Sequence, residues 1–194
     1  MLINLEGIDG CGKSTQSQLL MDEFEKNDEK TILLKEPTNG KYGRKLWEML
    51  SGKIEATTEE ILELFVMDRK EHVDQKINPA LNEGKIVLMD RYYYSTMAYQ
   101  AAAGIDVKRI RKDNEFAPKP DIVLVFDLTA DLAMKRVRGH SVADVFEKEE
   151  HLEKVRKAYL NLEDDPLVRI IDATRTPEEI FDEVWKLVSE VRNG

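Results

Sequence analysis

The sequence predicts an α/β fold in which a five-stranded parallel sheet is flanked by helices. Short apolar segments alternate with segments whose apolar residues recur at helical spacing, which is the pattern of strands joined by crossover helices. Of the 194 residues, 42 % are hydrophobic, enough for a buried core and too many for a disordered chain. No repeat, low-complexity stretch or linker divides the chain, so one domain over residues 1–194 is expected.

The expected strands are short and largely apolar. They cover Leu2–Glu6, Thr31–Lys35, Ile86–Met89, Ile122–Leu128 and Val168–Ile171. Ile86–Met89 is apolar throughout, as a strand buried on both faces should be. Pro37 and Asn39-Gly40 follow the second strand, and this composition predicts a loop.

The expected helices have an apolar face and recognisable starts. Thr57 with Glu60 three residues later predicts a capping box that starts a helix reaching about Val73. Thr176-Pro177-Glu178-Glu179 predicts the start of the last helix. Further helices are expected over Lys13–Lys26, up to about Gly84, and over Ser95–Ala103, Asp106–Glu115, Asp131–Arg138 and Glu149–Leu162, with an irregular stretch over Gly139–Ala143.

Charge and cysteine content limit the expected partners and location. The 29 Lys and Arg against 38 Asp and Glu leave a net charge of −9, which repels nucleic acid and anionic lipid, so neither partner is expected. No apolar run approaches the ~20 residues of a membrane span, and no basic residue precedes an apolar run at the start of the chain. Cys11 is the one cysteine, which fits a reducing, cytoplasmic location.

A phosphate-binding loop (P-loop) is predicted between the first strand and the first helix. Gly7-Ile8-Asp9-Gly10-Cys11-Gly12-Lys13-Ser14 matches G-x-x-x-x-G-K-[ST] in the right context. Its glycines let backbone N–H groups point at one anion, and the positive end of the helix faces the same point. Lys13 would bind the β- and γ-phosphates of ATP, and the Ser14 hydroxyl would bind Mg²⁺. The expected ATP contacts are Gly7, Ile8, Asp9, Gly10, Cys11, Gly12, Lys13, Ser14 and Thr15.

A second anchor is expected at Asp90-Arg91, where the third strand ends. Asp90 would lie beside the P-loop and hold Mg²⁺, directly or through water; the alternative is a helix cap. Arg91 would either pair with that carboxylate or clamp a second phosphate on the acceptor side. The sequence has no Asn-Lys-x-Asp guanine motif and no Asp-x-x-Gly after the third strand, and it lacks room for the extra strands of a motor ATPase. A small-molecule kinase is therefore the expected class.

Several motifs, taken in order and spacing, resemble those of the thymidylate (dTMP) kinases over essentially the whole chain. The motifs are Leu5–Gly10, Glu36-Pro37-Thr38, Phe65-x-x-x-Arg69, Asp90-Arg91-Tyr92, Ser95-Thr96-x-Ala98-Tyr99-Gln100, Lys119-Pro120-Asp121 and Asp144-x-Phe146-Glu147. The resemblance implies a P-loop NTPase fold with a short lid over about residues 135–148. It also implies transfer of the γ-phosphoryl group of Mg·ATP to dTMP, which gives ADP and dTDP, and a homodimer.

The resemblance further implies a set of residues that bind dTMP. Phe65 and Arg69 share a helix face and would contact the thymine ring and its O4, although the helix alone allows a core Phe and a solvated Arg. Asp9 would accept a hydrogen bond from the sugar 3′-hydroxyl, and Tyr99 would leave no space for a 2′-hydroxyl. The implied set is Asp9, Phe65, Arg69, Arg91, Thr96, Tyr99 and Gln100.

The densest basic cluster, Lys135-Arg136-Val137-Arg138, falls where the family carries its lid. Gly10 stands where some members have an Arg in the P-loop. Arg136 and Arg138 are therefore the candidates, with Lys13 and Arg91, for compensating the charge on the transferred phosphoryl group. Arg175, after the fifth strand, is either part of the adenine site or a surface charge.

The sequence departs from the family pattern in the lid, and two alternatives stay open. Residues 139–146 contain no further Arg, and Lys35 stands where many members have Arg. One alternative is a kinase for dUMP, dCMP or UMP, although Arg69 disfavours the amino group of cytosine and Tyr99 disfavours a ribose. The other is a nucleotide-binding regulator without turnover, which only the thinned lid favours.

Overall fold

The described residues form a five-stranded sheet in which every neighbouring pair is parallel. The computed structural model describes residues 1–136 and 142–193, with the side chains of 142–148 left out. The strands are β1 (Leu2–Glu6), β2 (Thr31–Lys35), β3 (Ile86–Asp90), β4 (Ile122–Asp127) and β5 (Val168–Asp172). Their order is β2-β3-β1-β4-β5. This confirms the predicted α/β class and the five strands.

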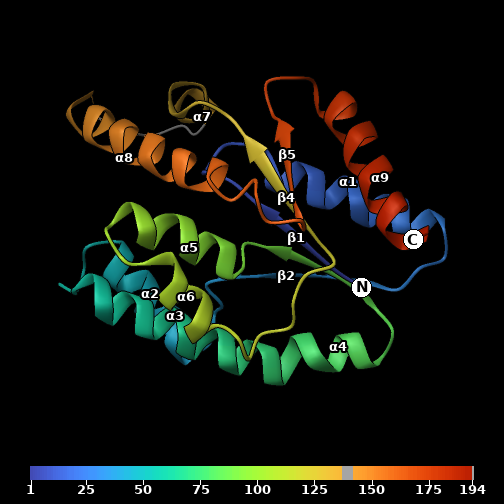
Figure 1. Cartoon of the computed structure of the whole chain (residues 1–194), viewed down its shortest axis with the longest axis horizontal. Helices are drawn as coiled ribbons and strands as arrows, with labels where there is room; N and C mark the ends of the chain where they lie inside the picture. The colour runs from blue at the N-terminus through green and yellow to red at the C-terminus, as the bar shows by residue number, and fades with distance from the viewer. Residues whose placement is uncertain (137–141, 194) are drawn as a thin grey trace.

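Helices cover both faces of the sheet, as Figure 1 shows. They are α1 (Lys13–Lys26), α2 (Lys41–Leu50), α3 (Thr58–His72), the π-helical turn η1 (Val73–Ile77), α4 (Asn78–Asn82), α5 (Tyr93–Ala102), α6 (Val107–Asp113), α7 (Ala130–Arg136), α8 (Val142–Leu160) and α9 (Pro177–Asn193). Helices α1 and α9 pack together on one side of the sheet, and α3, α5 and α8 lie on the other. No helix in the described part of the chain is both long and apolar enough to span a bilayer.

The topology places the carboxyl ends of all five strands at one edge. The chain leaves β1 toward β2 on one side and later crosses to β4 on the other, so the direction of winding changes beside β1. Ligands of open α/β sheets bind at such a point. The P-loop follows β1 and Asp90 ends β3, so both predicted anchors meet there.

Burial agrees with a sheet covered on both faces. Every residue of β1 and β3 is buried. Apolar side chains from β1, β3, β4 and β5 form one cluster with α1, α5, α8 and α9, and Ile32 and Leu34 of β2 pack against it. Two polar residues of β1, Asn4 and Glu6, are fully buried within it. Buried polar groups require partners, and those of Glu6 prove to belong to the site.

The predicted loop at Pro37 and Asn39-Gly40 is confirmed, but helix α2, which follows it from Lys41, was not predicted. Gly43 lowers the helix propensity of this segment, and the structure explains its presence. A Cβ on Gly43 would lie 2.0 Å from the carbonyl oxygen of Thr38. The glycine therefore lets α2 pack directly on the loop that follows β2, a tertiary contact that local sequence does not reveal.

Two predicted helix boundaries also shifted. The capping box of Thr57 and Glu60 is confirmed, but helical structure continues without a break through η1 into α4. Helix α8 begins at Val142 rather than Glu149. The last two residues of the expected irregular stretch, Val142 and Ala143, are therefore helical, and residues 139–141 lie outside the described residues. Helix α8 packs on α5 and α7, which the sequence pattern does not show.

Candidate active site

A cleft of about 570 Å³ lies at the carboxyl edge of the sheet. Asp9 and most of the remaining P-loop form its floor, and Asp90 and Arg91 come from the end of β3. The full lining is Asp9, Gly10, Cys11, Gly12, Lys13, Ser14, Thr15, Gln16, Lys35, Asp90, Arg91, Arg136, Arg175, Pro177 and Ile180. Gly7 and Ile8 lie beneath this surface and do not line it.

The P-loop has the close backbone packing that its glycines predict. Gly7 has φ +133°, and a Cβ there would lie 2.6 Å from the Phe126 carbonyl oxygen and 2.8 Å from the Cys11 Sγ. A side chain at this position would therefore push the loop away from β4. Gly12 precedes α1 in a left-handed conformation, which turns the start of the helix toward the cleft.

Lys13 lies against the loop that it closes. Its Nζ donates to the carbonyl oxygens of Gly7 at 3.0 Å and Ile8 at 3.1 Å, and it lies 3.7 Å from the Cys11 Sγ. Burial, followed by the charge of Arg91, lowers the pKa of the Lys13 ammonium below its ordinary value of 10.5. The carboxylates of Asp9 and Asp90 oppose this shift, and a bound phosphate would add further negative charge beside the buried ammonium.

Asp90 has one carboxylate oxygen available for a ligand. Oδ2 lies 3.2 Å from the Nζ of Lys35, whereas the buried Oδ1 has no hydrogen-bond partner among the described residues. The exposed hydroxyl of Ser14 lines the same cleft. No cluster of three His, Cys, Asp or Glu occurs in the described part. This donor set fits Mg²⁺, which takes few protein ligands and keeps phosphate oxygens and water.

Arg91 connects the P-loop to helix α5. Its Nη2 donates to Asp9 Oδ1 at 2.6 Å and to the Tyr99 hydroxyl at 3.3 Å. Its Nη1 donates to Ser95 Oγ at 3.0 Å and to the Tyr159 hydroxyl at 3.3 Å. The predicted pairing partner, Asp90, is not among these contacts. The guanidinium is instead aimed across the cleft at Asp9.

Glu6, at the buried end of β1, holds the start of α5 and the hydroxyl of Tyr159 in place. It was not expected at the site. Its carboxylate accepts hydrogen bonds from the backbone N–H groups of Tyr92 at 2.7 Å and Ser95 at 3.2 Å, and from the Tyr159 hydroxyl at 2.9 Å. It thereby satisfies the N–H of Tyr92 at the start of α5 and shares the N–H of Ser95, which also donates to the Tyr92 carbonyl oxygen at 3.0 Å. Burial raises the pKa of the Glu6 carboxyl, although its hydrogen bonds and Arg91 oppose the shift.

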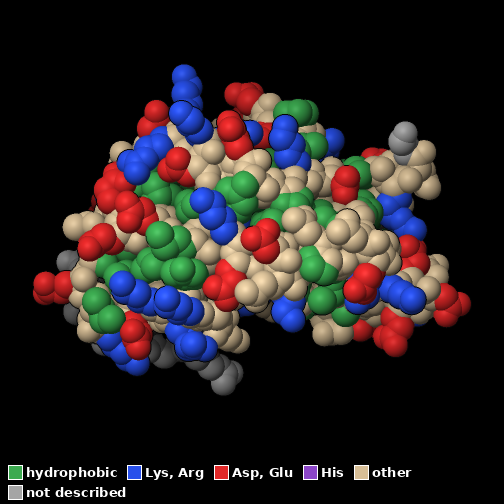
Figure 2. Space-filling model, turned by 90° about the horizontal axis from the view of Figure 1, so that it is seen from below, with side chains coloured by type: hydrophobic (Ala, Val, Ile, Leu, Met, Phe, Trp, Pro, Cys, Tyr) green, Lys and Arg blue, Asp and Glu red, His purple; other side chains and the backbone are tan. Residues whose placement is uncertain are grey.

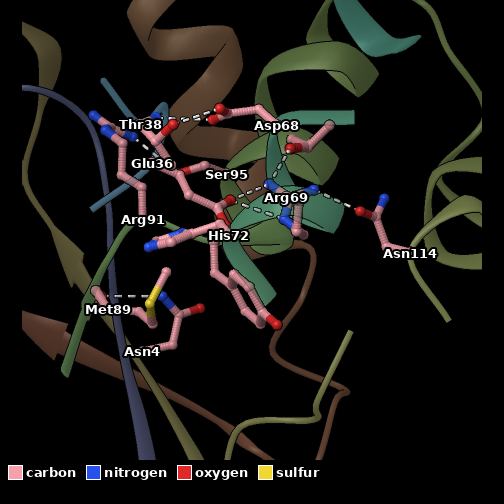
Figure 3. Close-up of polar contacts among 12 residues, drawn as sticks. Asn4, Glu36, Thr38, Asp68, Arg69, His72, Met89, Arg91, Ser95 and Asn114 are labelled. Carbon is pink, nitrogen blue, oxygen red and sulfur yellow. Dashed lines mark hydrogen bonds and ion pairs between the residues drawn. The ribbon is translucent and has the colours of Figure 1, made fainter. Parts of the chain in front are cut away.

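Arg69 is buried in a polar cluster beside the cleft (Figure 3). Its Nε donates to Glu36 Oε2 at 2.8 Å, its Nη1 to Asn114 Oδ1 at 2.5 Å, and its Nη2 to Thr96 Oγ1 at 3.1 Å. The side chain is 1 % exposed, so the alternative of a solvated Arg69 is wrong. Thr96, which was expected among the dTMP-binding residues, contacts Arg69.

Phe65 and Gln100 lie on the helices that carry Arg69 and Thr96, and each has a group that a ligand could contact. Phe65 is half-buried, one helical turn before Arg69, and it is not among the described side chains that pack against the hydrophobic core. Gln100 is 6 % exposed, and its Oε1 has no hydrogen-bond partner in the described part of the chain. Neither residue therefore serves only the core.

The expected adenine and lid residues are partly described. Arg136 lines the cleft, and its Nη2 donates to the Ala173 carbonyl oxygen at 3.2 Å. Arg175 also lines the cleft, but its guanidinium pairs with Glu183. Arg138 lies outside the described residues.

Sequence reasoning left several residues out of the predicted site. Lys35 lines the cleft and pairs with Asp90, and its place before Glu36-Pro37 was the available signal. Glu36 lies in that same motif. Asn114 belongs to none of the motifs, so no local signal could have found it.

A P-loop at the switch point of a parallel sheet, with Arg91 reaching across the cleft to it and a buried polar cluster around Arg69, is typical of a nucleotide-dependent phosphotransferase of the nucleoside monophosphate kinase class. The thymidylate kinase family model matches residues 5–184. The chain is 41 % identical over 194 residues to a probable thymidylate kinase of Archaeoglobus fulgidus, covering 100 % of this chain and 97 % of that protein. It is 42 % identical over 193 residues to the thymidylate kinase of Desulfotalea psychrophila, covering 98 % and 95 %.

The chain belongs to the thymidylate kinase family, which phosphorylates dTMP to dTDP with ATP. A third relative, a probable thymidylate kinase of Thermococcus onnurineus, is 41 % identical over 200 residues and covers 97 % of each chain. The predicted family, fold and class of enzyme are thus confirmed.

Proposed function

We propose that this chain transfers the γ-phosphoryl group of Mg·ATP to dTMP for dTTP synthesis, as one domain with a lid over about residues 135–148. The observation that carries the proposal is the position of Arg91. It contacts Asp9 of the P-loop and Tyr99 of α5 at the same time, so a single guanidinium lies between the donor and acceptor sides. An Arg there can bring two phosphate anions together without a general base, because the acceptor is itself a phosphate.

The P-loop forms the donor side. Backbone N–H groups and the start of α1 bind the phosphates of ATP, and Lys13 moves from the loop carbonyls to the β- and γ-phosphates. Arg136 and Arg138 are the proposed lid contacts to the transferred phosphoryl group. Arg175 contributes to the adenine site after release from Glu183.

Magnesium is the proposed metal. Asp90 Oδ1 and the Ser14 hydroxyl would hold it, directly or through water, and when bound it neutralises charge on the phosphates. Asp90→Asn should therefore raise the Mg²⁺ concentration that gives half-maximal turnover.

The acceptor side lies along α3 and α5. Phe65 stacks on the thymine ring, and Arg69 donates to its O4. Gln100 offers its Oε1, which has no partner among the described residues, to the N3–H of thymine. Thr96 orients Arg69 and does not contact the base. Asp9 accepts from the sugar 3′-hydroxyl, and Tyr99 excludes a ribose.

The direct test is coupled ADP release from Mg·ATP with dTMP, dUMP, dCMP, UMP, AMP and GMP each as the acceptor. A strong preference for dTMP is expected. Preference for another monophosphate would keep the kinase but contradict the assignment of Phe65, Arg69 or Tyr99. ATP binding without ADP release for any acceptor would favour a nucleotide-binding regulator.

The proposal places the enzyme in the cytoplasm as a homodimer, with neither nucleic acid nor membrane as a partner. Large apolar side chains on neighbouring helices support self-association: Trp47 and Leu50 of α2 and Met67 of α3 are each between 45 % and 48 % exposed. Figure 2 shows hydrophobic side chains gathered among charged ones on the face seen from below. A patch of this kind on a protein surface is a common site of association.

A further inference from the structure

The orientation of the Arg69 guanidinium is set by three segments that are distant in the sequence. Glu36 follows β2, Thr96 lies in α5, and Asn114 follows α6. The guanidinium also lies over the ring of Tyr92, with its Cζ 5.4 Å from the ring centroid. Since Glu36 and Asn114 lie on opposite sides of the guanidinium (Figure 3), its plane is held in one orientation.

The contacts of the Arg69 guanidinium leave one of its N–H protons without an acceptor among the described residues. A guanidinium has five N–H bonds. Nε faces Glu36, Nη2 faces both Thr96 and Glu36 Oε2, which lies 2.7 Å away, and Nη1 faces Asn114. One proton of Nη1 has no acceptor among the described residues. The cluster therefore turns a side chain with many donors into one that offers a single directed donor.

Two of the partners of Arg69, Glu36 and Asn114, are themselves held in place. Glu36 Oε1 lies 3.1 Å from the Nδ1 of His72. The Nδ2 of Asn114 donates to the Ile110 carbonyl oxygen at 2.7 Å, so its Oδ1 is the atom that faces Arg69. Glu36 and Asn114 are each 3 % exposed. Without them, the buried charge of Arg69 would be poorly compensated and its direction undefined.

We propose that Glu36 and Asn114 are positioning residues that restrict Arg69 to one free donor, and that this restriction selects a base with a carbonyl rather than an amino group opposite it. The inference rests on the proposed function. Thymine presents a carbonyl oxygen at position 4, whereas cytosine presents an amino group there. A fixed donor facing an amino donor leaves both unpaired, but a mobile guanidinium can turn away and tolerate it.

The test is steady-state kinetics of the full chain with dTMP and dCMP at saturating Mg·ATP. Asn114→Ala should raise the KM for dTMP roughly tenfold and lower the preference for dTMP over dCMP in kcat/KM by about tenfold. The kcat for dTMP and the KM for ATP should stay within about twofold, because the P-loop and Arg91 are untouched. Glu36→Gln, which keeps the side-chain shape but removes the charge, should shift the same two quantities in the same direction, and it decides the matter if Asn114→Ala does not fold.

Asn4→Ala is the matched control. Asn4 is also a buried Asn whose Nδ2 donates to a main-chain carbonyl, that of Met89 at 3.3 Å. In the described part of the chain, no hydrogen bond joins it to Arg69. Its loss should lower thermal stability and leave the ratio of dTMP to dCMP unchanged.

The outcomes separate the positioning role from the proposed function. A wild-type enzyme that does not use dTMP would overturn the proposed function. A wild-type enzyme that prefers dTMP, together with an Asn114→Ala variant of unaltered KM and unaltered preference, would overturn the positioning role alone. A loss that is equal for all acceptors and matches Asn4→Ala would also overturn it, because it would show a purely structural role.

Discussion

Arg91 has a left-handed backbone conformation, with φ +69°, that non-glycine residues rarely adopt. Its N–H donates to the Leu5 carbonyl oxygen at 3.0 Å, and its side chain reaches Asp9 on the other side of the cleft. The conformation costs about 1–2 kcal/mol. In this backbone conformation the Arg91 guanidinium points toward the P-loop instead of along β3.

Arg91→Ala should abolish use of the acceptor while ATP still binds, because the P-loop contacts remain. Arg91→Gly should lose the same activity but be about 1 kcal/mol more stable than Arg91→Ala, since glycine tolerates positive φ. Acceptor-dependent ADP release and urea unfolding measure the two effects. Unchanged turnover in either variant would remove Arg91 from the site.

The ring and the hydroxyl of Tyr99 have roles that substitution can separate. The ring lies beside Arg91, with the Arg91 Cζ 5.2 Å from its centroid, and the hydroxyl accepts a hydrogen bond from Arg91. Tyr99→Ala should raise kcat/KM for ribonucleotides, relative to that for deoxyribonucleotides, by at least tenfold. This corresponds to a loss of about 1.4 kcal/mol of discrimination. Tyr99→Phe, which keeps the ring, is the control and should still select deoxyribose. Selectivity that survives in Tyr99→Ala would exclude the proposed steric role.

At the scale of elements, the start of α5 is tied to the end of β1 through Glu6. A buried carboxylate that accepts two N–H groups satisfies the helix start and interacts favourably with its dipole. The same carboxylate accepts a hydrogen bond from Tyr159 of α8. Helices α5 and α8 thus pack around one buried anion, which sets the position of Arg91 through Ser95 and Tyr159.

The buried Glu6 carboxyl predicts that the free energy of unfolding depends on pH. Burial raises the pKa of folded Glu6 above its ordinary value of 4.5, so the folded state binds this proton more tightly than the unfolded state. Its contribution to stability is therefore fully present below about pH 4.5 and is lost as pH rises through the folded pKa. Glu6→Gln lacks the titration, so the wild-type free energy of unfolding minus that of the variant should fall as pH rises from 4.5. Denaturant unfolding at several pH values measures it, and a constant difference would contradict the raised pKa.

At the scale of the whole molecule, the exposed apolar side chains of α2 and α3 predict a homodimer. Sedimentation should give twice the mass of one chain, and Trp47→Asp should shift it toward the mass of a monomer, because a charge cannot be buried there without a partner. Asp22→Asn, an exposed change on α1, is the control and should leave the mass unchanged. A wild-type monomer at micromolar concentration would contradict the proposed dimer.

The class of the protein follows from patterns that are local in the sequence. The P-loop, the alternation of strands and helices and the capping box of Thr57 are local patterns, because each depends on residues that are close along the chain. The bounds of β1, α1 and β2 follow from such patterns and agree with the structure. The order of the motifs was enough to identify the family.

The support of the candidate site, in contrast, comes from contacts between residues that are far apart in the sequence. Arg69 meets Glu36 and Asn114 across 33 and 45 residues of chain, and Glu6 meets Ser95 across 89. Helix α2 likewise depends on the close approach of Gly43 to Thr38. Contacts of this kind arise from packing between elements, and no periodicity or local motif encodes them. A sequence can therefore specify the residues that meet the substrate, while the buried groups that orient those residues emerge only when the elements are packed together.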